Sequence, residues 1–438
     1  MLHRDHRKFQ PNGETKIWKM YHLVIYFHTL IDRFYTPLLQ EYLELFPVVA
    51  VVGPRQVGKS TLVTSALIGK DRTYQTLDDL SLRSVAERDP QAFLDHPGPV
   101  TIDVVQLAPG LLRQVKLLTD RERVPGRFLL TGSADLDHCA DLSAVLAGRV
   151  GVLRLPPITR AEETGTQQWR DLLRCETVED LDDTFAGQTA APFDPARLLR
   201  GGFPLSIQAS SDRARALWMN SFRMTYLERD LRRISDIGNL ADFDRLMRLS
   251  AAVSSGLLNQ AHLARDAGLS PATAGRHLSV LEASLLIHRL PPYFTNVGKR
   301  LVKSPKLFWT DTGLCAHLLG LSHTSDLAAE PLLRGKLFET FVMMEIRALL
   351  PLVLPSARLF HLRTHDQLEI DGLIDTGRKK LLFEVKAGRT VTADDAAPIE
   401  RWLALKPDHG PGLVLYGGEE YRILSRNVRA VPVSLLFG

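Results

Sequence analysis

A complete phosphate-binding loop sets the first requirement on how this chain folds. Its pattern is G-x-x-x-x-G-K-[ST], and its residues are Gly53, Pro54, Arg55, Gln56, Val57, Gly58, Lys59 and Ser60, followed by Thr61. The two glycines let the backbone curl so that N–H groups point at phosphate oxygens. The lysine places its charge at the β- and γ-phosphates, and the serine hydroxyl is a ligand for Mg²⁺. We therefore predict a nucleotide site at residues 53–61, with ATP and Mg²⁺ as cofactors.

The segments on either side of the loop agree with this interpretation. Val48–Val52 is a short apolar run rich in β-branched residues, as expected of a buried parallel strand. Residues 61–67 can continue as a helix whose N-terminus faces the phosphates. A glycine-rich surface turn is the alternative, and it would need neither segment. The strand–loop–helix order predicts that the loop belongs to an α/β domain.

Two further short strands are expected at residues 99–103 and 127–131, and each ends in a polar residue. Strands separated by helices indicate a parallel sheet covered on both faces, with ligands at the carboxyl ends of the strands. Asp103 is then the second acidic element of the site and binds Mg²⁺ through water. Thr131 and Ser133, in Thr131-Gly-Ser133, are candidate sensors of the γ-phosphate, and capping of the strand end is the equally weighted alternative role.

Hydrolysis usually needs a further carboxylate to orient and deprotonate the attacking water. The residue directly after Asp103 is Val104, which cannot accept a proton. A missing general base lowers a rate by about 10²–10⁴. Either Asp78 or Asp79 substitutes, or the chain binds ATP and turns it over poorly, so enzymatic activity stays open. Arg149 is a candidate arginine finger, acting in cis or on a neighbouring subunit, and a solvated surface arginine is the alternative.

The composition restricts the class of protein. A chain of 438 residues with 45% hydrophobic and 24% charged residues fits a globular protein of about three domains. Because the net charge is only +4, any nucleic-acid surface must be local. The three cysteines lie far apart, which fits a reducing cytosol and cytoplasmic location. The apolar segment 17–31 is too short and too interrupted to cross a membrane. We expect residues 1–30 to be a loosely attached leader, and disorder and a position upstream of the true start are the alternatives left open.

A helix-turn-helix pattern lies in the middle of the chain. Residues 258–268 indicate a short helix closed by Gly268, and Ser270 with Pro271 should begin the next helix. Two strand-like runs follow, and residues 259–306 contain seven Lys or Arg against two Asp or Glu. This order is typical of a winged helix, whose DNA contacts would be Thr273, Arg276, His277, Lys299, Arg300 and Lys303. A packing or protein-interaction module with solvated charges is the alternative.

The C-terminal region contains a nuclease-like pattern. Residues 369–375 and 381–388 alternate as two strands around a turn at 376–380. Glu384 and Lys386 then project from one face, and the hairpin brings Asp371 beside Glu384. Two carboxylates and a lysine are what a metal-dependent phosphodiesterase needs, and Glu345 on a helix is a candidate further ligand. An ordinary amphipathic hairpin with a salt bridge is the alternative.

Together these residues resemble a known family. The chain is similar to prokaryotic P-loop ATPases of the AAA+-like superfamily in which a winged helix and a restriction-endonuclease-like domain of unknown function follow the ATPase. The matching segments are Gly53–Leu62, Ile102-Asp-Val-Val-Gln106, Leu129–Ser133, Leu146-Ala-Gly-Arg149, Gly201-Gly-Phe-Pro204, Tyr226–Asp230, Lys303-Ser-Pro-Lys306, Asp311-Thr-Gly-Leu314 and Phe383-Glu-Val-Lys386. The resemblance implies that Lys59, Ser60 and Asp103 hold phosphate and Mg²⁺. The family usually has glutamate in place of Val104, so hydrolysis does not follow.

The sequence therefore predicts an α/β protein with a leader and three folded parts. These are a P-loop ATPase domain at 31–190, a helical region with a winged helix at 191–330 and a nuclease-like domain at 331–438. The first functional hypothesis is an ATP-binding, weakly hydrolysing ATPase whose nucleotide state is coupled to the other domains. The second is a DNA-binding or metal-dependent nuclease module for which ATP is a conformational ligand. Expected partners are ATP, DNA under the second hypothesis, and another copy of the chain if Arg149 acts in trans; no membrane is expected.

Overall fold

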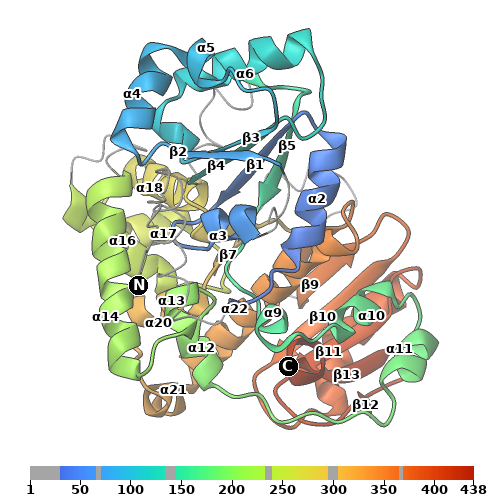
Figure 1. The fold of residues 1–438 in the computed structure, drawn as a ribbon. Helices are drawn as coiled ribbons and strands as arrows, with labels where there is room; N and C mark the ends of the chain where they lie inside the picture. Colours follow the sequence, from blue (N-terminus) through green and yellow to red (C-terminus); the bar gives the residue numbers. More distant parts are fainter. Residues whose placement is uncertain (1–29, 66–70, 134–144, 232–238, 294–303, 365–367) are drawn as a thin grey trace, which may run out of the picture. The chain divides into compact units, whose positions relative to one another are not determined.

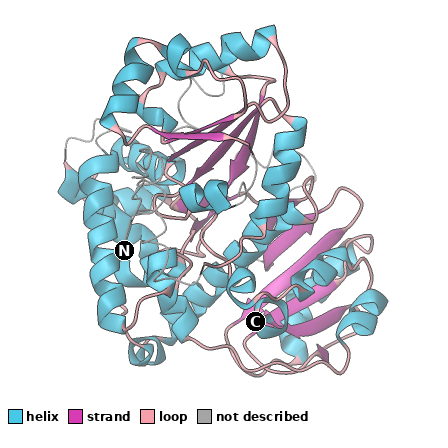
Figure 2. Cartoon of the chain, viewed as in Figure 1, coloured by secondary structure: helices cyan, strands magenta, loops and turns pink. Residues whose placement is uncertain are grey.

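The computed structural model describes residues 30–65, 71–133, 145–231, 239–293, 304–364 and 368–438 (Figures 1 and 2). Contacts divide the chain after Asp32, and Arg33–Gly438 forms one unit. The leader expected over residues 1–30 lies, except for Leu30, outside the described residues. Among the described residues, every helix is too short or too polar to cross a lipid bilayer.

Five parallel strands form the first sheet (Figure 1). In spatial order they are β2 (Thr73–Thr76), β3 (Val100–Asp103), β4 (Phe128–Ser133), β1 (Val48–Gly53) and β5 (Val150–Arg154). Alternate residues of β1 enter two separate hydrophobic cores, as the two-residue period of a strand requires. One core includes α4 (Leu80–Arg88), α5 (Pro90–Phe93) and α6 (Gly110–Arg121), and the other includes α2 (Tyr35–Leu45) and α3 (Lys59–Ser65). The expected parallel α/β sheet covered on both faces is confirmed.

Short helices follow the first sheet. They are α9 (Arg160–Thr164), α10 (Gln168–Arg174), α11 (Val178–Phe185), α12 (Ala196–Arg200), α13 (Pro204–Ile207), α14 (Asp212–Thr225) and the π-helical turn η2 (Tyr226–Asp230). Residues 176–183 are rich in Asp and Glu, and most of them form α11, which begins with a capping box between Thr177 and Asp180. Asp182 of this helix pairs with Arg429 at 2.7 Å. The acidic residues therefore cap and anchor a helix.

A three-helix segment with a hairpin comes next. It consists of α16 (Leu240–Ala252), α17 (Gln260–Asp266), α18 (Pro271–Ala283) and the antiparallel strands β6 (Ile287–Leu290) and β7 (Lys306–Trp309). The expected cap is present, because the Ser270 hydroxyl accepts a hydrogen bond from the Thr273 N–H at 3.1 Å. An isolated bridge also joins Leu257 to Lys306. The helix-turn-helix pattern thus leads directly into a hairpin.

Two glycine-containing motifs pack against each other. The Asp311 side chain accepts hydrogen bonds from the N–H groups of Gly202 and Leu314. A Cβ atom at Gly201 would lie 2.4 Å from the Asp311 carboxylate, and one at Gly313 would lie 2.9 Å from the Arg200 backbone. Side chains at these positions would force the two segments apart. These motifs of the sequence therefore join α12 to α20 (Thr312–Leu318).

A six-stranded mixed sheet forms the C-terminal part. Its order is β12 (Arg422–Ile423), β13 (Val428–Pro432), β11 (Gly412–Tyr416), β10 (Lys380–Lys386), β9 (Glu369–Asp375) and β8 (Arg358–Arg363). Strands β8, β9 and β10 are antiparallel neighbours, and β10, β11 and β13 are parallel. The helical elements here are α21 (Thr324–Ala329), α22 (Pro331–Leu349), η3 (Leu350–Leu352), η4 (Ala393–Ala396), α23 (Ala397–Leu405) and α24 (Val433–Phe437).

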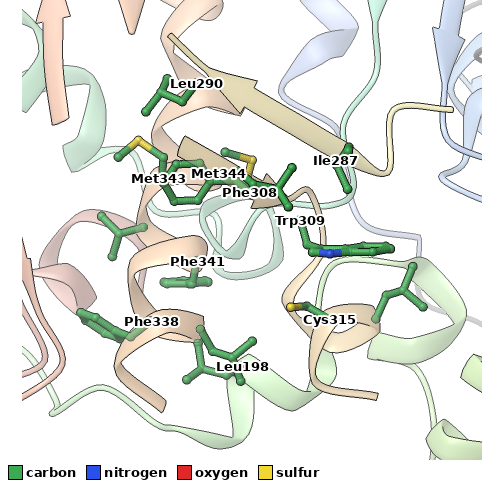
Figure 3. Packing of buried hydrophobic residues seen from close by; sticks show 14 of the residues in the cluster. Leu198, Ile287, Leu290, Phe308, Trp309, Cys315, Phe338, Phe341, Met343 and Met344 are labelled. Atoms are coloured by element: carbon green, nitrogen blue, oxygen red, sulfur yellow. The ribbon is translucent and has the colours of Figure 1, made fainter. Parts of the chain in front are cut away.

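Helix α22 lies at the centre of the largest hydrophobic core. This core joins α22 to the hairpin β6–β7, to α16–α18 and to the C-terminal sheet. Figure 3 shows part of it, where Met343 and Met344 of α22 lie beside Phe308 of β7. Since buried apolar area is the main stabilising contribution to a fold, the helical segment and the C-terminal sheet share one core.

Candidate functional site

The phosphate-binding loop connects β1 to α3 in the strand–loop–helix order expected from the sequence. Gln56 and Gly58 have φ values of +60° and +97°, in the left-handed region that glycine adopts without strain. A Cβ atom at Gly53 would lie 2.5 Å from the Leu155 carbonyl oxygen. The loop therefore requires glycine at both fixed positions, at Gly53 for space and at Gly58 for backbone conformation.

The polar side chains at the end of the loop meet Asp103. The Lys59 ammonium donates to the Gly53 and Pro54 carbonyls at 3.1 and 2.8 Å. The Ser60 hydroxyl donates to the Asp103 carboxylate, 2.9 Å from Oδ2. Asp103 is only 5% exposed although it ends a strand. A hydroxyl beside a buried carboxylate is an oxygen ligand pair of the kind that Mg²⁺ prefers, so these residues fit the expected metal.

Two further hydroxyls bind the same carboxylate. The Thr131 hydroxyl of β4 donates to Asp103 Oδ1, and the Tyr74 hydroxyl of β2 donates to Oδ2 at 2.7 Å. Tyr74 was missed at the level of sequence, because nothing near residue 74 signals a site. Its position follows from β2 and β3 being neighbours, with Thr76 aligned to Asp103. Asp103 is therefore held in place from both adjacent strands.

The position after Asp103 has an unusual backbone. Val104 has φ +61° and ψ +41°, and a β-branched residue in this left-handed region is strained. Its N–H donates to the Thr131 hydroxyl at 3.2 Å. The chain thus holds residue 104 in a fixed conformation beside Asp103, but with a side chain that cannot accept a proton.

The two candidate substitute bases, Asp78 and Asp79, differ in how strongly their surroundings hold them. Asp79 caps α4, because its carboxylate accepts the N–H groups of Ser81 and Leu82 at 2.7 and 3.1 Å. Asp78 is exposed at the end of β2, on the same edge of the sheet as Asp103. Asp79 is therefore occupied by the helix, and Asp78 is the less constrained of the two carboxylates.

The predicted sensor and arginine finger lie at opposite ends of the sheet. Ser133 aligns with Gly53 across β4 and β1, so it lies beside the start of the phosphate-binding loop. Arg149 immediately precedes β5, whose first residue aligns with Val48 at the start of β1. Its side chain pairs with Asp120 at the end of α6. The prediction that Arg149 reaches the phosphates in cis is therefore wrong, because the length of the sheet separates them.

Arg33, which the sequence did not single out, joins the loop to a later helix. Its guanidinium donates to the Val57 carbonyl at 3.1 Å, to the Pro156 carbonyl at 2.7 Å and to Glu162 Oε1 at 3.0 Å. The Glu162 side chain is fully buried and also receives the Thr159 N–H at 2.9 Å. The phosphate-binding loop is thus fixed to the N-terminus of α9 by one arginine.

A second group of charged residues lies between α22 and the C-terminal sheet. We call it the lysine–carboxylate cluster, and its members are Lys306, Glu339, Glu369, Asp371, Glu384 and Lys386. The Lys306 ammonium lies 3.0 Å from Glu339, 2.9 Å from Glu369 and 3.0 Å from Asp371, and the residue is only 2% exposed. Burial lowers the pKa of Lys306, but the three carboxylates outweigh it and raise that pKa overall.

The hairpin brings three predicted residues together in this cluster. Strands β9 and β10 align Gly372 with Phe383, which places Asp371 across from Glu384. Lys386 lies 3.6 Å from Glu384, and Asp371 Oδ2 accepts the Val385 N–H at 3.0 Å. Glu384 is 5% exposed, and its Oε1 has no hydrogen-bond partner among the described residues. Burial and the Asp371 charge raise the pKa of Glu384 well above its ordinary value.

Glu345 does not belong to the cluster, and this prediction is wrong. Its carboxylate accepts the Arg160 N–H at 2.8 and 3.0 Å, so it caps α9 instead. The glutamate of α22 that does belong to the cluster is Glu339, six residues before Glu345, and it accepts a hydrogen bond from Lys306. Within the described part of the chain, no group of three or more His, Cys, Asp or Glu is arranged to hold a metal ion. The Lys306 ammonium lies between the carboxylates of Glu339, Glu369 and Asp371, in the position that a cation would occupy.

The predicted DNA contacts on α18 differ in exposure. Arg276 is exposed and Thr273 is partly exposed. His277 is 3% exposed, and its ring lies 5.0 Å from that of Phe243, so its assignment as a DNA contact is wrong. Burial lowers the pKa of His277, which keeps this core imidazole neutral. Lys299, Arg300 and Lys303 lie outside the described residues.

Comparison with known proteins assigns the chain to a family. Two relatives, Uncharacterized protein Rv2008c of Mycobacterium tuberculosis and Uncharacterized protein Mb2031c of Mycobacterium bovis, are each 34% identical over 400 residues. The alignments cover 90% of this chain and 82% of each relative. The chain belongs to the same family as these two proteins.

Family models divide this chain into three matched regions. Residues 45–163 match an AAA domain, residues 195–325 a domain of unknown function (DUF8612) and residues 334–436 another domain of unknown function (DUF4143). The AAA match and the loop at the end of β1 confirm the expected P-loop ATPase-like domain. The two C-terminal matches carry no activity over to the chain.

Solved structures give weaker likenesses. The Walker-type ATPase PABY2304 of Pyrococcus abyssi has a TM-score of 0.41 at 15% identity, over 66% of this chain and 96% of that one. RuvB of Thermotoga maritima has a TM-score of 0.27 at 18% identity, over 58% of this chain and 88% of that one. Similarity at this level supports no argument about the activity or partners of this chain.

Proposed function

We propose that this protein is a nucleotide-dependent switch that binds ATP with Mg²⁺ and hydrolyses it slowly. The observation that carries the proposal is the contact between Ser60, at the end of a complete phosphate-binding loop, and the buried Asp103 carboxylate, 2.9 Å away. Lys59 would hold the β- and γ-phosphates, and Ser60 with Asp103 would hold the metal. When bound, Mg²⁺ would supply positive charge that offsets the phosphate oxygens.

Slow turnover is proposed because residue 104 is valine. The strained backbone at this position supports the view that residue 104 is held beside the site, so that its side chain decides the rate. Ser133 is proposed as the γ-phosphate sensor on the ground that it aligns with Gly53. Arg149 can take part in catalysis only at the nucleotide site of a neighbouring copy of the chain, and this role would require the protein to form an oligomer.

The test of nucleotide binding is a titration of a fluorescent ATP analogue in the presence of Mg²⁺. We expect Lys59→Ala to weaken binding strongly, whereas Lys406→Ala, which removes an exposed lysine elsewhere, leaves the affinity unchanged. Omitting Mg²⁺ should also weaken binding to the wild type, and Asp103→Asn should abolish that dependence. Equal affinity of the wild type and Lys59→Ala would contradict the proposal.

A second candidate function is metal-dependent cleavage of nucleic acid by the C-terminal domain. It is favoured by the Oε1 atom of Glu384, which is buried beside Asp371 and Lys386 without a hydrogen-bond partner among the described residues. Buried polar atoms of this kind need an explanation, and an ion is one. A divalent cation bound there would displace the Lys306 ammonium from Asp371, so activity would be latent in this conformation.

Plasmid cleavage with Mg²⁺ or Mn²⁺ tests this candidate. We expect cleavage to be lost in Glu384→Ala and to persist in Glu345→Gln, whose carboxylate serves α9. Absence of cleavage by both the wild type and Lys306→Met, at every metal concentration at which the protein is folded, would contradict it.

DNA binding is the accompanying proposal for the helical segment. Two helices followed by an antiparallel hairpin support a winged-helix arrangement, in which α18 presents Arg276 to DNA. Because phosphate contacts release counterions, the affinity should fall steeply with salt. The measurement is DNA affinity from low to moderate salt for the wild type and for joint replacement of Arg276, Lys299 and Arg300. Binding that the triple replacement leaves unchanged would reject this surface.

A further inference from the structure

A cavity of about 640 Å³ lies behind the phosphate-binding loop. Its lining comes from α2, from Pro54 of the loop, from β5 and residues 155–157, from the hairpin strand β6, from the end of α22 and from β8. The Tyr35 hydroxyl of α2 donates to the Ala348 carbonyl of α22 at 2.6 Å and so closes one side. Volumes of about 300–1,000 Å³ are typical of sites for small organic ligands.

The charged residues that line the cavity are all basic. They are Arg154, Arg347 and Arg358, the imidazole of His288 lies among them, and no Asp or Glu belongs to the lining. The rest of the wall is mostly aliphatic and aromatic, with Leu38, Leu153 and Met344 as examples. An apolar wall with a few cationic groups is complementary to an anion that has an apolar body.

Two of these side chains have no partner in the protein. Within the described part of the chain, neither the Arg347 guanidinium nor the His288 ring makes a hydrogen bond or an ion pair. Glu282, the acidic residue that influences Arg347 electrostatically, already pairs with Arg289 at 2.7 Å. Burial lowers the pKa of Arg347 and, together with the Arg347 charge, holds that of His288 well below its ordinary value. Arg347 is half-buried and an arginine remains charged in proteins, so its guanidinium is free to pair with an anion that enters the cavity.

From this geometry we infer that the cavity is a binding site for an apolar organic anion, whose carboxylate or phosphate group pairs with Arg347. The guanidinium donates in a fork that matches either head group, and His288 can donate a second hydrogen bond from its neutral ring. The apolar body of the ligand would lie against α2 and Met344.

This cavity is separate from the place expected for the phosphates of a nucleotide, but the phosphate-binding loop contributes to both sites. Pro54 lines the cavity, whereas Ser60 and Asp103 meet at the other end of the loop. A ligand in the cavity would therefore contact the loop from behind. The inference does not rest on ATP binding, and the two can fail independently.

The test uses two matched fluorescent probes on the full chain, 1-pyrenebutyrate and its neutral analogue 1-pyrenebutanol. Because the acid can form charge-assisted hydrogen bonds with Arg347, we expect it to bind roughly tenfold or more tightly than the alcohol. Arg347→Met should abolish that preference, and Arg378→Met, which removes an exposed arginine in the β9–β10 turn, should retain it. Equal binding of the acid and the alcohol to the wild type would overturn the inference.

Two further measurements keep the inference open to refutation. Leu38→Trp narrows the cavity and leaves Arg347 and His288 in place, so it should weaken binding of both probes even if Arg347→Met does not fold. Lys59→Ala should leave the acid probe bound, and loss of the probe in this variant would show that the cavity belongs to the nucleotide site. Competition by decanoate and by decyl phosphate then identifies the head group, and failure of both to displace the acid probe would also overturn the assignment.

Discussion

At the scale of single residues, the phosphate-binding loop is predictable because its chemistry is local. Gly53, Gly58, Lys59 and Ser60 act within one turn of chain, and their spacing alone specifies the loop. The partners of this loop are not predictable in the same way. Arg33 reaches Glu162 across 129 residues, and Tyr74 reaches Asp103 across 29. Such contacts follow from strand order, which no local pattern in the sequence specifies.

Replacing Val104 by glutamate should increase ATP hydrolysis. The substitution places a proton acceptor next to Asp103, and a general base contributes about 10²–10⁴ in rate. The measurement is phosphate release at saturating ATP for the two proteins. Val104→Ala is the matched control, because it relieves the β-branched strain at φ +61° without adding a carboxylate, and it should leave the rate unchanged. Brisk hydrolysis by the wild type, slowed by Val104→Glu, would contradict this role.

Glu345 should make stability depend on pH. Burial raises its pKa to about 7, whereas a glutamate in an unfolded chain titrates near ~4.3. The folded state therefore binds the proton more tightly, and this residue's contribution to the free energy of unfolding falls as the pH rises from about 4.3 through 7. The buried Arg197 opposes the shift and Glu162 adds to it.

Urea unfolding of the wild type and Glu345→Gln at pH 5, 6, 7 and 8 measures this contribution. A glutamine still accepts the Arg160 N–H, so the variant retains the cap of α9 but cannot ionise. We expect the difference in stability between the two proteins to shift in favour of the variant as the pH rises. A difference that is independent of pH would show that Glu345 titrates normally.

At the scale of elements, the hairpin β9–β10 was predictable and its partners were not. The two-residue period of the strands and the turn at 376–380 specify that Asp371 meets Glu384. The error at Glu345 comes from helix geometry. At ~100° per residue, the side chains of Glu339 and Glu345 point in directions about 120° apart around α22, so only one of them can face the sheet. Helix α22 is buried on most of its surface, so its hydrophobic pattern does not indicate which of the two glutamates faces the sheet.

Lys306→Met should destabilise the protein strongly. One ammonium holds Glu339 of α22 to Glu369 and Asp371 of β9. Removing it leaves the carboxylates of Glu339 and Asp371 without this cation, whereas Glu369 keeps Arg363 at 3.5 Å. Breaking a buried ion pair in this way costs about 3–5 kcal/mol. The measurement is chemical unfolding at pH 7.5.

A lysine in the same sheet provides the control. Among the described residues, the Lys380 ammonium pairs with one carboxylate, that of Asp375 at 3.4 Å, so Lys380→Met should cost clearly less than Lys306→Met. If the carboxylates of the lysine–carboxylate cluster can hold a divalent cation, Mn²⁺ should restore part of the stability of Lys306→Met and none of that of Lys380→Met. Equal, small losses in the two variants would mean that Lys306 does not compensate the cluster.

At the scale of the whole molecule, hydrogen bonds connect the phosphate-binding loop to α22. The Val57 carbonyl accepts from Arg33, and Arg33 pairs with Glu162 of α9. The N-terminus of α9 then donates from Arg160 to Glu345 of α22. The sequence predicted three parts along the chain but gave no sign of this connection, because each contact joins residues that are distant in sequence and carry no motif. A continuous series of hydrogen bonds of this kind is the physical link that coupling between the loop and α22 requires.

Nucleotide binding should therefore change the protection of α22, and Arg33→Ala should remove that change. The measurement is amide hydrogen exchange with and without Mg²⁺ and a non-hydrolysable ATP analogue. In the wild type we expect bound nucleotide to slow exchange in the loop, in α9 and in the part of α22 around Glu345. In Arg33→Ala the loop should still be protected when the analogue saturates it, while α22 should no longer respond. Arg174→Ala, which removes an exposed arginine with a partner 3.9 Å away, should behave as the wild type does. A response of α22 that survives Arg33→Ala would mean that the signal travels by another route, and its absence in the wild type would mean that nucleotide state is not transmitted to this helix.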